Sequence, residues 1–319
     1  MIDLQKLIAG DRRTLAKAIT LIESTKEEDQ IKSQELLNKI LNGNKKSFRL
    51  GITGSPGVGK STFIENFGQY LISQNHKVAV LAIDPSSPTS GGSILGDKTR
   101  MEKLSNDPSA FIRPTPSSGT LGGVAQKTRE AILLCEAAGF DFIIIETVGV
   151  GQSEFEVANM VDFFMILMLP NSGDELQGIK KGILELADAI VVNKADGDSE
   201  NLAIKSQAQF QSALELFRHN PLWKTKVSSC SALTNKNIDQ IYTMLKEFQE
   251  TVGEEYILKN RNKQNKDWFT NLVSELIKFK LNSDKKLAGL KTTLEAEVLS
   301  GQKLAVVAAS EYVEKALKN

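Results

Sequence analysis

The segment from Gly54 to Ser61 could bind the phosphates of a nucleotide. It reads Gly-Ser-Pro-Gly-Val-Gly-Lys-Ser and matches the pattern G-x-x-x-x-G-K-[ST] at every fixed position. Glycines let the backbone wrap so that its N–H groups, and the start of the next helix, point at the phosphates. Lys60 would reach the β- and γ-phosphates, and the Ser61 hydroxyl would ligate Mg²⁺. The alternative is a glycine turn between a strand and a helix. The residues expected to line the nucleotide here are Gly54, Ser55, Pro56, Gly57, Val58, Gly59, Lys60, Ser61 and Thr62.

A second segment, Asn-Lys-Ala-Asp at residues 193–196, could read the base. Asp196 can accept hydrogen bonds from guanine N1–H and from the exocyclic amine. Adenine lacks both donors there, so ATP would leave a buried carboxylate unpaired. Asn193 would address the other edge of the base and hold the loop, and the stem of Lys194 would cover the ring. The alternative is a polar turn that ends a strand. The next apolar run is followed by residues that could offer a backbone N–H to the guanine carbonyl oxygen: Ser231, Ala232 and Leu233.

Acidic residues near these loops could surround a Mg²⁺ ion. Asp84 ends an apolar run, and a carboxylate at the carboxyl end of a parallel strand can reach the metal directly or through water. Asp97 follows a stretch rich in Pro, Ser and Gly that could order when the γ-phosphate is present. Each Asp could equally be a turn or cap residue.

A third acidic segment reads Glu-Thr-Val-Gly at residues 146–149, where many GTPases have Asp-x-x-Gly. Glu146 would face the metal or its water, and the Gly149 N–H could sense the γ-phosphate. Three polar residues follow within reach of an attacking water, and the sequence does not choose between Gln152, Ser153 and Glu154.

Residues 171–180 form a further candidate mobile segment between a strand and a helix. Its charges could simply cap that helix, and this interpretation is favoured for Asp174. An arginine finger has no defined place in the sequence; Arg100 and Arg113 are the nearest candidates. We therefore expect slow intrinsic turnover.

The elements that must position these segments alternate between short apolar runs and longer helical stretches. Unbroken runs rich in Val and Ile are typical of parallel strands buried on both faces, so we predict an α/β P-loop fold with a mostly parallel sheet flanked by helices. The expected strands are Phe48–Thr53, Val78–Asp84, Phe142–Thr147, Phe163–Leu169, Ala189–Asn193 and Lys226–Cys230. The expected helices between them are Ser61–Ser73, Gly122–Ala138, Asp174–Leu186 and Glu200–Arg218.

The two ends of the chain have helical periodicity instead. Apolar residues recur at helical spacing in residues 1–45, and again beyond residue 251. We therefore expect an N-terminal helical extension (1–45), a nucleotide-binding core (46–250) and a C-terminal helical arm (251–319).

Composition narrows the function classes. With 39 basic and 39 acidic residues the net charge is zero, so we expect neither nucleic acid nor an especially basic partner. The start of the chain has no secretory pattern, and the apolar run Val161–Leu169 is far shorter than the roughly 20 residues of a membrane span, which favours the cytoplasm. Cys135 and Cys230 are expected to be free core thiols.

Two long motifs closely resemble one family. They are Ile83–Met101, which contains Asp84 and Asp97, and Glu146–Glu154; with the phosphate loop they resemble the MeaB/ArgK family. That family comprises GTPase chaperones of adenosylcobalamin-dependent methylmalonyl-CoA mutase and related acyl-CoA mutases. The resemblance extends from about residue 5 into the C-terminal helices.

The resemblance implies a GTPase that binds GTP and GDP, with Mg²⁺ near Ser61, Asp84, Asp97 and Glu146. It also implies a C-terminal arm through which two subunits pair, and a further switch that links nucleotide state to the mutase, with Asp174, Gln177 and Lys180 as candidates. The expected catalytic set is Lys60, Asp97, Glu146, Gln152, Asp174 and Lys180.

The expected function is to gate cofactor loading and to protect the mutase. Three alternatives stay open. A metal-delivery GTPase for nickel enzymes would carry Cys or His clusters, whereas this chain has two Cys and two His. An amino-acid transport ATPase or kinase would not need a guanine loop. A structural helical dimer with a degenerate nucleotide site would not need Lys60 or Ser61.

Overall fold

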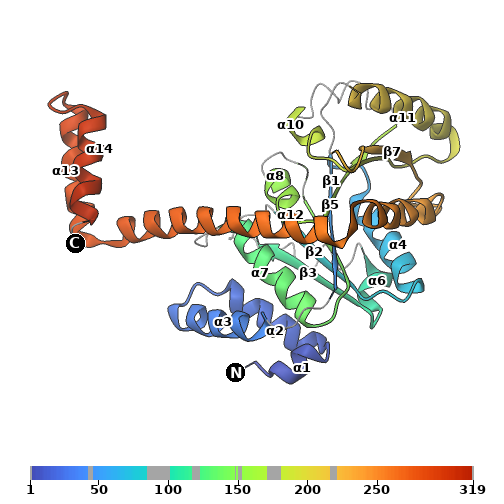
Figure 1. Cartoon of the computed structure of the whole chain (residues 1–319), viewed down its shortest axis with the longest axis horizontal. Coiled ribbons are helices and arrows are strands. Elements are labelled where there is room, and N and C mark those ends of the chain that lie inside the picture. The colour runs from blue at the N-terminus through green and yellow to red at the C-terminus, as the bar shows by residue number, and fades with distance from the viewer. Residues whose placement is uncertain are drawn as a thin grey trace. The chain divides into compact units, whose positions relative to one another are not determined.

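A seven-stranded sheet forms the centre of the fold, and every neighbouring pair of strands is parallel (Figure 1). A computed structural model describes residues 2–41, 46–84, 101–116, 123–147, 149, 153–170, 181–215 and 221–317. The strand order is β3-β2-β4-β1-β5-β6-β7. The strands are β1 Phe48–Gly54, β2 Val78–Asp84, β3 Ala110–Pro116, β4 Phe142–Glu146, β5 Phe163–Met168, β6 Ala189–Val192 and β7 Lys226–Ser229. The α/β fold class with a parallel sheet is confirmed.

The strands are apolar on both faces because helices cover both. In β4, Phe142 and Ile144 belong to one buried cluster, and Ile143 and Ile145 belong to the other. Successive side chains of a strand point to opposite faces, so an unbroken apolar run is what two covered faces require. This alternation explains five of the six runs chosen from the sequence. The sixth, β7, has the sequence Lys-Val-Ser-Ser, is half-buried and is the last strand of the sheet.

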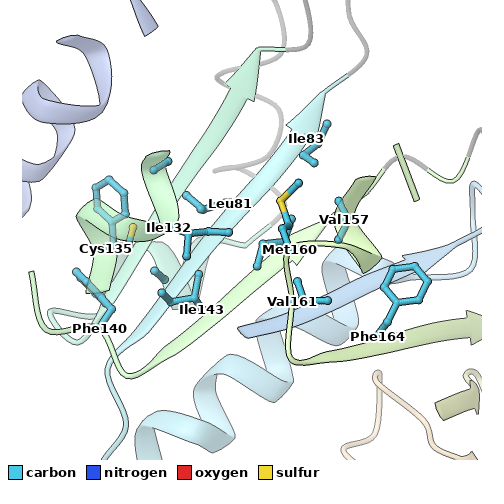
Figure 2. Packing of buried hydrophobic residues seen from close by; sticks show 14 of the residues in the cluster. Leu81, Ile83, Ile132, Cys135, Phe140, Ile143, Val157, Met160, Val161 and Phe164 are labelled. Carbon is cyan, nitrogen blue, oxygen red and sulfur yellow. The ribbon is translucent and has the colours of Figure 1, made fainter. Parts of the chain in front are cut away.

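Each face of the sheet has its own set of helices (Figure 1). One face packs against α4 (Lys60–Ser73), α6 (Glu102–Asn106) and the first part of α12 (Ile238–Ser283). α12 is broken at Gly253, whose φ and ψ angles of 74° and 163° are not helical, so its first part ends there. The other face is covered by α7 Gly123–Ala137, α8 Ser153–Ala158, α10 Lys181–Leu184 and α11 Glu200–Leu214. Outside them, α2 Arg12–Glu23 and α3 Glu27–Ile40 pack against α7, and α1 Leu4–Ile8 packs against α2. In Figure 2, Ile132 of α7 and Val157 of α8 lie over Leu81, Ile143 and Phe164 of the sheet.

The elements that were not predicted include strand β3 and the helices α6 and α8. β3 contains Pro114 and Pro116, and its apolar run covers only residues 110–112. Proline cannot donate a hydrogen bond to a ladder, so it occurs in strands that lie at the edge of a sheet. β3 lies at such an edge and pairs with β2 along its whole length.

Three of the four predicted helices have shorter counterparts, whereas α4 begins one residue before the predicted Ser61. The stretch Gly122–Ala138 corresponds to α7, and Glu200–Arg218 to α11, whose last predicted residues 216–218 lie outside the described ranges. The stretch Asp174–Leu186 corresponds to α10 at its end, while residues 174–180 lie outside the described ranges.

Four charged side chains fasten α12 to the amino ends of β1 and β5. Arg261 of α12 donates to both carboxylate oxygens of Asp162, at 2.7 and 2.5 Å, and its NH1 lies 3.6 Å from Glu136 Oε1. Arg49 of β1 donates to both oxygens of Glu136, at 2.8 and 3.0 Å. These paired, multiply bonded charges hold the helix to the edge of the sheet opposite the strands' carboxyl ends.

The chain divides into two compact units, Met1–Gln264 and Asn265–Asn319. The second contains the end of α12, α13 (Lys285–Leu299) and α14 (Ala305–Leu317), with Lys303 paired to Glu297 and Glu311. None of the described helices is both long and apolar enough to cross a membrane. The division into extension, core and arm at residues 45 and 250 stays a proposal.

Candidate nucleotide-binding site

The candidate site lies at the carboxyl ends of neighbouring strands. The phosphate loop leaves β1, the segment with Glu146 leaves β4, and Asn193 follows β6. In the order β4-β1-β5-β6 these strands are close together, and their carboxyl ends share one edge of the sheet because all are parallel. Ligands of open α/β sheets bind in the crevice at this edge.

The phosphate loop has the backbone conformation that its glycines allow. Gly57 and Gly59 have φ angles of 83° and 93°, in the left-handed region that other residues rarely adopt. A Cβ atom at Gly59 would lie 2.9 Å from Asn193 Nδ2, so position 59 also needs the space. Gly59 is the N-cap of α4 and therefore orients the start of that helix, where N–H groups favour an anion.

Lys60 lies folded against the loop. Its Nζ donates to the carbonyl oxygens of Gly54, at 2.7 Å, and of Ser55, at 3.3 Å. Burial lowers the pKa of Lys60, and the carboxylates of Glu146 and Glu154 oppose that shift. An anion bound beside Nζ would favour the charged ammonium, so this lysine suits a phosphate. The residues of the loop therefore fit a nucleoside polyphosphate.

Two of the four predicted metal ligands lie side by side. Ser61, in the first turn of α4, places its Oγ 3.5 Å from Glu146 Oε1 at the end of β4. Glu146 is buried, and a hydroxyl with a carboxylate is the oxygen donor set that Mg²⁺ prefers. Asp84 ends β2 at the same edge of the sheet, but its side chain is outside the described part, as is the whole of Asp97. The described residues fit a magnesium ion.

Thr147, which directly follows β4, is hydrogen-bonded to β1, the strand that leads into the phosphate loop. Thr147 donates its hydroxyl to Thr53 Oγ1 at 2.7 Å and its N–H to Ile52 O at 3.0 Å. Gly149 has a φ angle of 86°, and a Cβ there would lie 2.0 Å from Gly54 O. Only glycine fits so close to the loop. Gly149 thus lies against the phosphate loop, where an added Cβ would be 3.5 Å from Lys60 Nζ.

Glu154, one of the three candidates for positioning water, lies buried beside the exit from β4. It accepts a long hydrogen bond from Thr147 Oγ1 at 3.5 Å, and affects the pKa of Lys60 electrostatically. Of the other two candidates, Gln152 and the side chain of Ser153 lie outside the described residues.

Asn193 joins the phosphate loop to residues 231–233, which follow β7; segments 193–196 and 231–233 together form the guanine loop. Its Nδ2 donates to Val58 O at 2.9 Å, and its Oδ1 accepts from Ala232 N–H at 3.0 Å. The thiol of Cys230 also lies 3.7 Å from that oxygen. Asn193 is almost completely buried, so both ends of its amide need these partners.

The two charged residues of the guanine loop are placed differently. Lys194 has a φ angle of 59° and donates from Nζ to Gly57 O at 2.8 Å, so its stem crosses toward the phosphate loop. Asp196 is half-buried and precedes the short helix Gly197–Ser199, but its carboxylate does not cap that helix. The carboxylate is therefore not explained by a capping role.

The remaining predicted residues are not brought into the described site. Arg113 donates to Glu23 at 2.5 Å and to Thr20 at 3.3 Å, both on α2, so this arginine is a structural ion-pair partner rather than a finger. Outside the described residues lie Arg100, Asp174, Gln177 and Lys180. The sequence did not single out Thr53 or Thr147 for their hydroxyl bond, because no motif spacing marks it.

Comparison with known proteins identifies the family. The model of the family described as "Methylmalonyl Co-A mutase-associated GTPase MeaB" matches residues 15–286. This protein belongs to that family. As a member it is a P-loop GTPase, an enzyme that hydrolyses GTP.

Individual relatives agree with the family. "GTPase ArgK" of Escherichia coli is 49% identical over 85% of this chain and 83% of its own length. The mouse "Methylmalonic aciduria type A homolog, mitochondrial" is 46% identical over 98% of this chain and 78% of its own. A crystal structure titled "LAO/AO transport system kinase" has a TM-score of 0.78 and 37% identity, and the match covers 98% of this chain and 95% of that one.

Substitutions in the guanine loop and in the phosphate loop should have different effects on nucleotide binding. Asp196→Asn should reduce the ratio of GDP to ADP affinity by about 10- to 100-fold, because a hydrogen-bonded charge is lost from the base site only. Lys60→Ala should weaken both nucleotides and leave that ratio unchanged. Isothermal titration calorimetry with Mg²⁺ measures both constants, and an Asp196→Asn variant with the wild-type ratio would remove Asp196 from the base site.

Proposed function

We propose that this protein is a Mg²⁺-dependent GTPase chaperone of an adenosylcobalamin-dependent acyl-CoA mutase, methylmalonyl-CoA mutase or a related enzyme. In this role it gates loading of the cofactor and protects the mutase. The observation that carries the proposal is the match of residues 15–286 to a family described as methylmalonyl-CoA mutase-associated. The geometry of the candidate site supports the nucleotide part.

The proposed chemistry assigns each described residue a task. Lys60 neutralises charge on the β- and γ-phosphates from within the loop, where burial strengthens its interaction with an anion. Ser61 and Glu146 hold Mg²⁺, with Asp84 and Asp97 as further proposed ligands. The metal, when bound, offsets charge that develops on the phosphate oxygens. Gly149 offers its N–H to the γ-phosphate.

Contacts between α8 and α10 support a link from this site to the proposed partner switch. α8 follows the Glu146–Gln152 segment, and α10 follows residues 171–180. The Phe155 ring of α8 packs against Gly182 of α10, where an added Cβ would lie 3.1 Å from the ring. A shift of one helix would therefore move the other, and we propose that Asp174, Gln177 and Lys180 respond in this way to the nucleotide state.

Metal delivery is less well supported. Both cysteines are free and buried. Burial raises the pKa of Cys230 to about 12, so its thiol stays protonated at neutral pH and is a poor metal ligand. The Cys230 thiol instead donates a hydrogen bond to Asn193 Oδ1, at a distance of 3.7 Å.

Stimulation by the client is the direct test of the proposed function. We expect steady-state GTP hydrolysis with Mg²⁺ to be slow alone, and to rise several-fold when an adenosylcobalamin-dependent acyl-CoA mutase is added. ATP hydrolysis should stay low in both cases. The Lys60→Ala variant with the same mutase controls for contaminating activity. GTP turnover indifferent to the mutase would contradict the chaperone proposal while leaving the GTPase in place.

The second unit supports pairing of two subunits, which we propose together with a cytoplasmic location. In α12, Phe269, Val273, Leu276 and Ile277 recur at helical spacing and are 38–68% exposed. Apolar residues at these intervals form one stripe along a helix. A stripe of this kind is stabilised when a second helix covers it, and another copy of this chain supplies a matching surface.

A charged residue introduced into this apolar stripe should separate the two subunits. Leu276→Glu should shift sedimentation of the full chain from a two-subunit to a one-subunit mass, because a carboxylate would be buried between helices. The control is Ser274→Glu, two residues away on another side of α12, where the serine hydroxyl bonds only to Thr270 O. A wild-type chain that sediments as one subunit at all concentrations would rule out this pairing.

A further inference from the structure

The side chain of Asn66 connects α4 to the guanine loop. Its Nδ2 donates to Ala232 O at 2.9 Å, a contact between residues 166 positions apart. The same nitrogen donates to Thr62 O, one turn earlier on α4, at 3.2 Å. α4 is the helix that begins with Lys60 and Ser61, so this contact fixes the guanine loop relative to the start of that helix.

The amide NH₂ of Asn66 is suited to both contacts. The two partners are carbonyl oxygens, which accept and do not donate. The nitrogen has two hydrogens, one for each oxygen. An aspartate of the same size would place a negative oxygen against both carbonyls, and alanine would contact neither.

Ala232 is held from both sides by side chains of different elements. Asn193 accepts from its N–H at 3.0 Å, and Asn66 donates to its carbonyl oxygen at 2.9 Å. The Ala232 carbonyl shares a planar trans peptide with the N–H of Leu233, and in such a peptide the two groups point in opposite directions. The contact with Asn66 therefore sets the direction of the Leu233 N–H.

We propose that Asn66 is a positioning residue for base selection. By fixing the peptide between Ala232 and Leu233, it aims a backbone N–H at the position of the guanine carbonyl oxygen. An adenine amino group at that position is itself a donor and would oppose the N–H. This inference rests on the proposed nucleotide site. It adds that Asn66 determines how the site distinguishes a carbonyl oxygen from an amino group at position 6 of the base.

The composition of α4 agrees with a role outside the helix itself. Asparagine is a poorer helix former than alanine, because its side chain competes for backbone hydrogen bonds. At position 66 it lies inside a 14-residue helix. Replacement by alanine should therefore not weaken α4, and its effect on binding would report the contact with Ala232.

The test compares three nucleoside diphosphates that differ only in the base. GDP and IDP both carry the carbonyl oxygen at position 6, IDP lacks the amine that Asp196 would read, and ADP lacks both. Affinities are measured by isothermal titration calorimetry with Mg²⁺ for the wild-type full chain, Asn66→Asp, Asn66→Ala and Asp196→Asn. Ser73→Ala is the matched control, since this α4 hydroxyl bonds to Tyr70 O of its own helix.

Asn66→Asp and Asn66→Ala should weaken GDP and IDP by the same factor, about 3- to 10-fold, as expected for one hydrogen bond. ADP affinity should change less than about twofold, so that the GDP to ADP ratio falls. Asp196→Asn should instead affect GDP more than IDP, and Ser73→Ala should leave all three constants unchanged.

Two results would overturn the role of Asn66. One is that both variants bind all three nucleotides as tightly as the wild type does. The other is an equal loss for all three nucleotides, which would mean that Asn66 acts on the phosphate loop through α4. Two other results would instead contradict the proposed guanine site itself. One is a wild-type chain that does not prefer GDP to ADP, and the other is an Asp196→Asn variant that keeps the wild-type preference.

Discussion

The candidate site depends on one buried amide, that of Asn193. Its nitrogen bonds to the phosphate loop at Val58 O, and its oxygen bonds to the guanine loop at Ala232 N–H. A buried polar group without a partner costs roughly 1–3 kcal/mol, so loss of Asn193 would leave two such groups unpaired. The close approach also explains Gly59, since a side chain there would meet the amide. Two loops that are far apart in the sequence are thereby held as one surface.

The parallel sheet makes this joining possible. Because β1 and β6 run in the same direction with β5 between them, the loops that leave them reach the same edge. At the opposite, amino ends of the strands lies the ion-pair network that fastens α12, formed by Arg49, Glu136, Asp162 and Arg261. The candidate nucleotide loops and the network that fastens α12 therefore lie at different ends of the strands.

The sequence predicted the elements whose physical signal is local. Unbroken apolar runs mark strands covered on both faces, and the glycines of the phosphate loop mark positions of unusual backbone angle. β3 escaped prediction because edge strands tolerate prolines and need only a short apolar run. The contact of Asn66 with Ala232 could not be predicted from spacing, since it arises only when α4 and the guanine loop meet in the folded chain. The same holds for the hydroxyl bond between Thr53 and Thr147.

Asn193 is expected to hold the phosphate and guanine loops as one site, and the affinity for inorganic pyrophosphate tests this role most directly. Pyrophosphate meets the phosphate loop but has no base. If Asn193 supports both loops, the Asn193→Ala variant should lose affinity for pyrophosphate as well as for GDP, each by about tenfold or more. Circular dichroism of the same sample checks that the variant is folded. A folded variant that binds pyrophosphate like the wild type, and loses only GDP, would contradict this role.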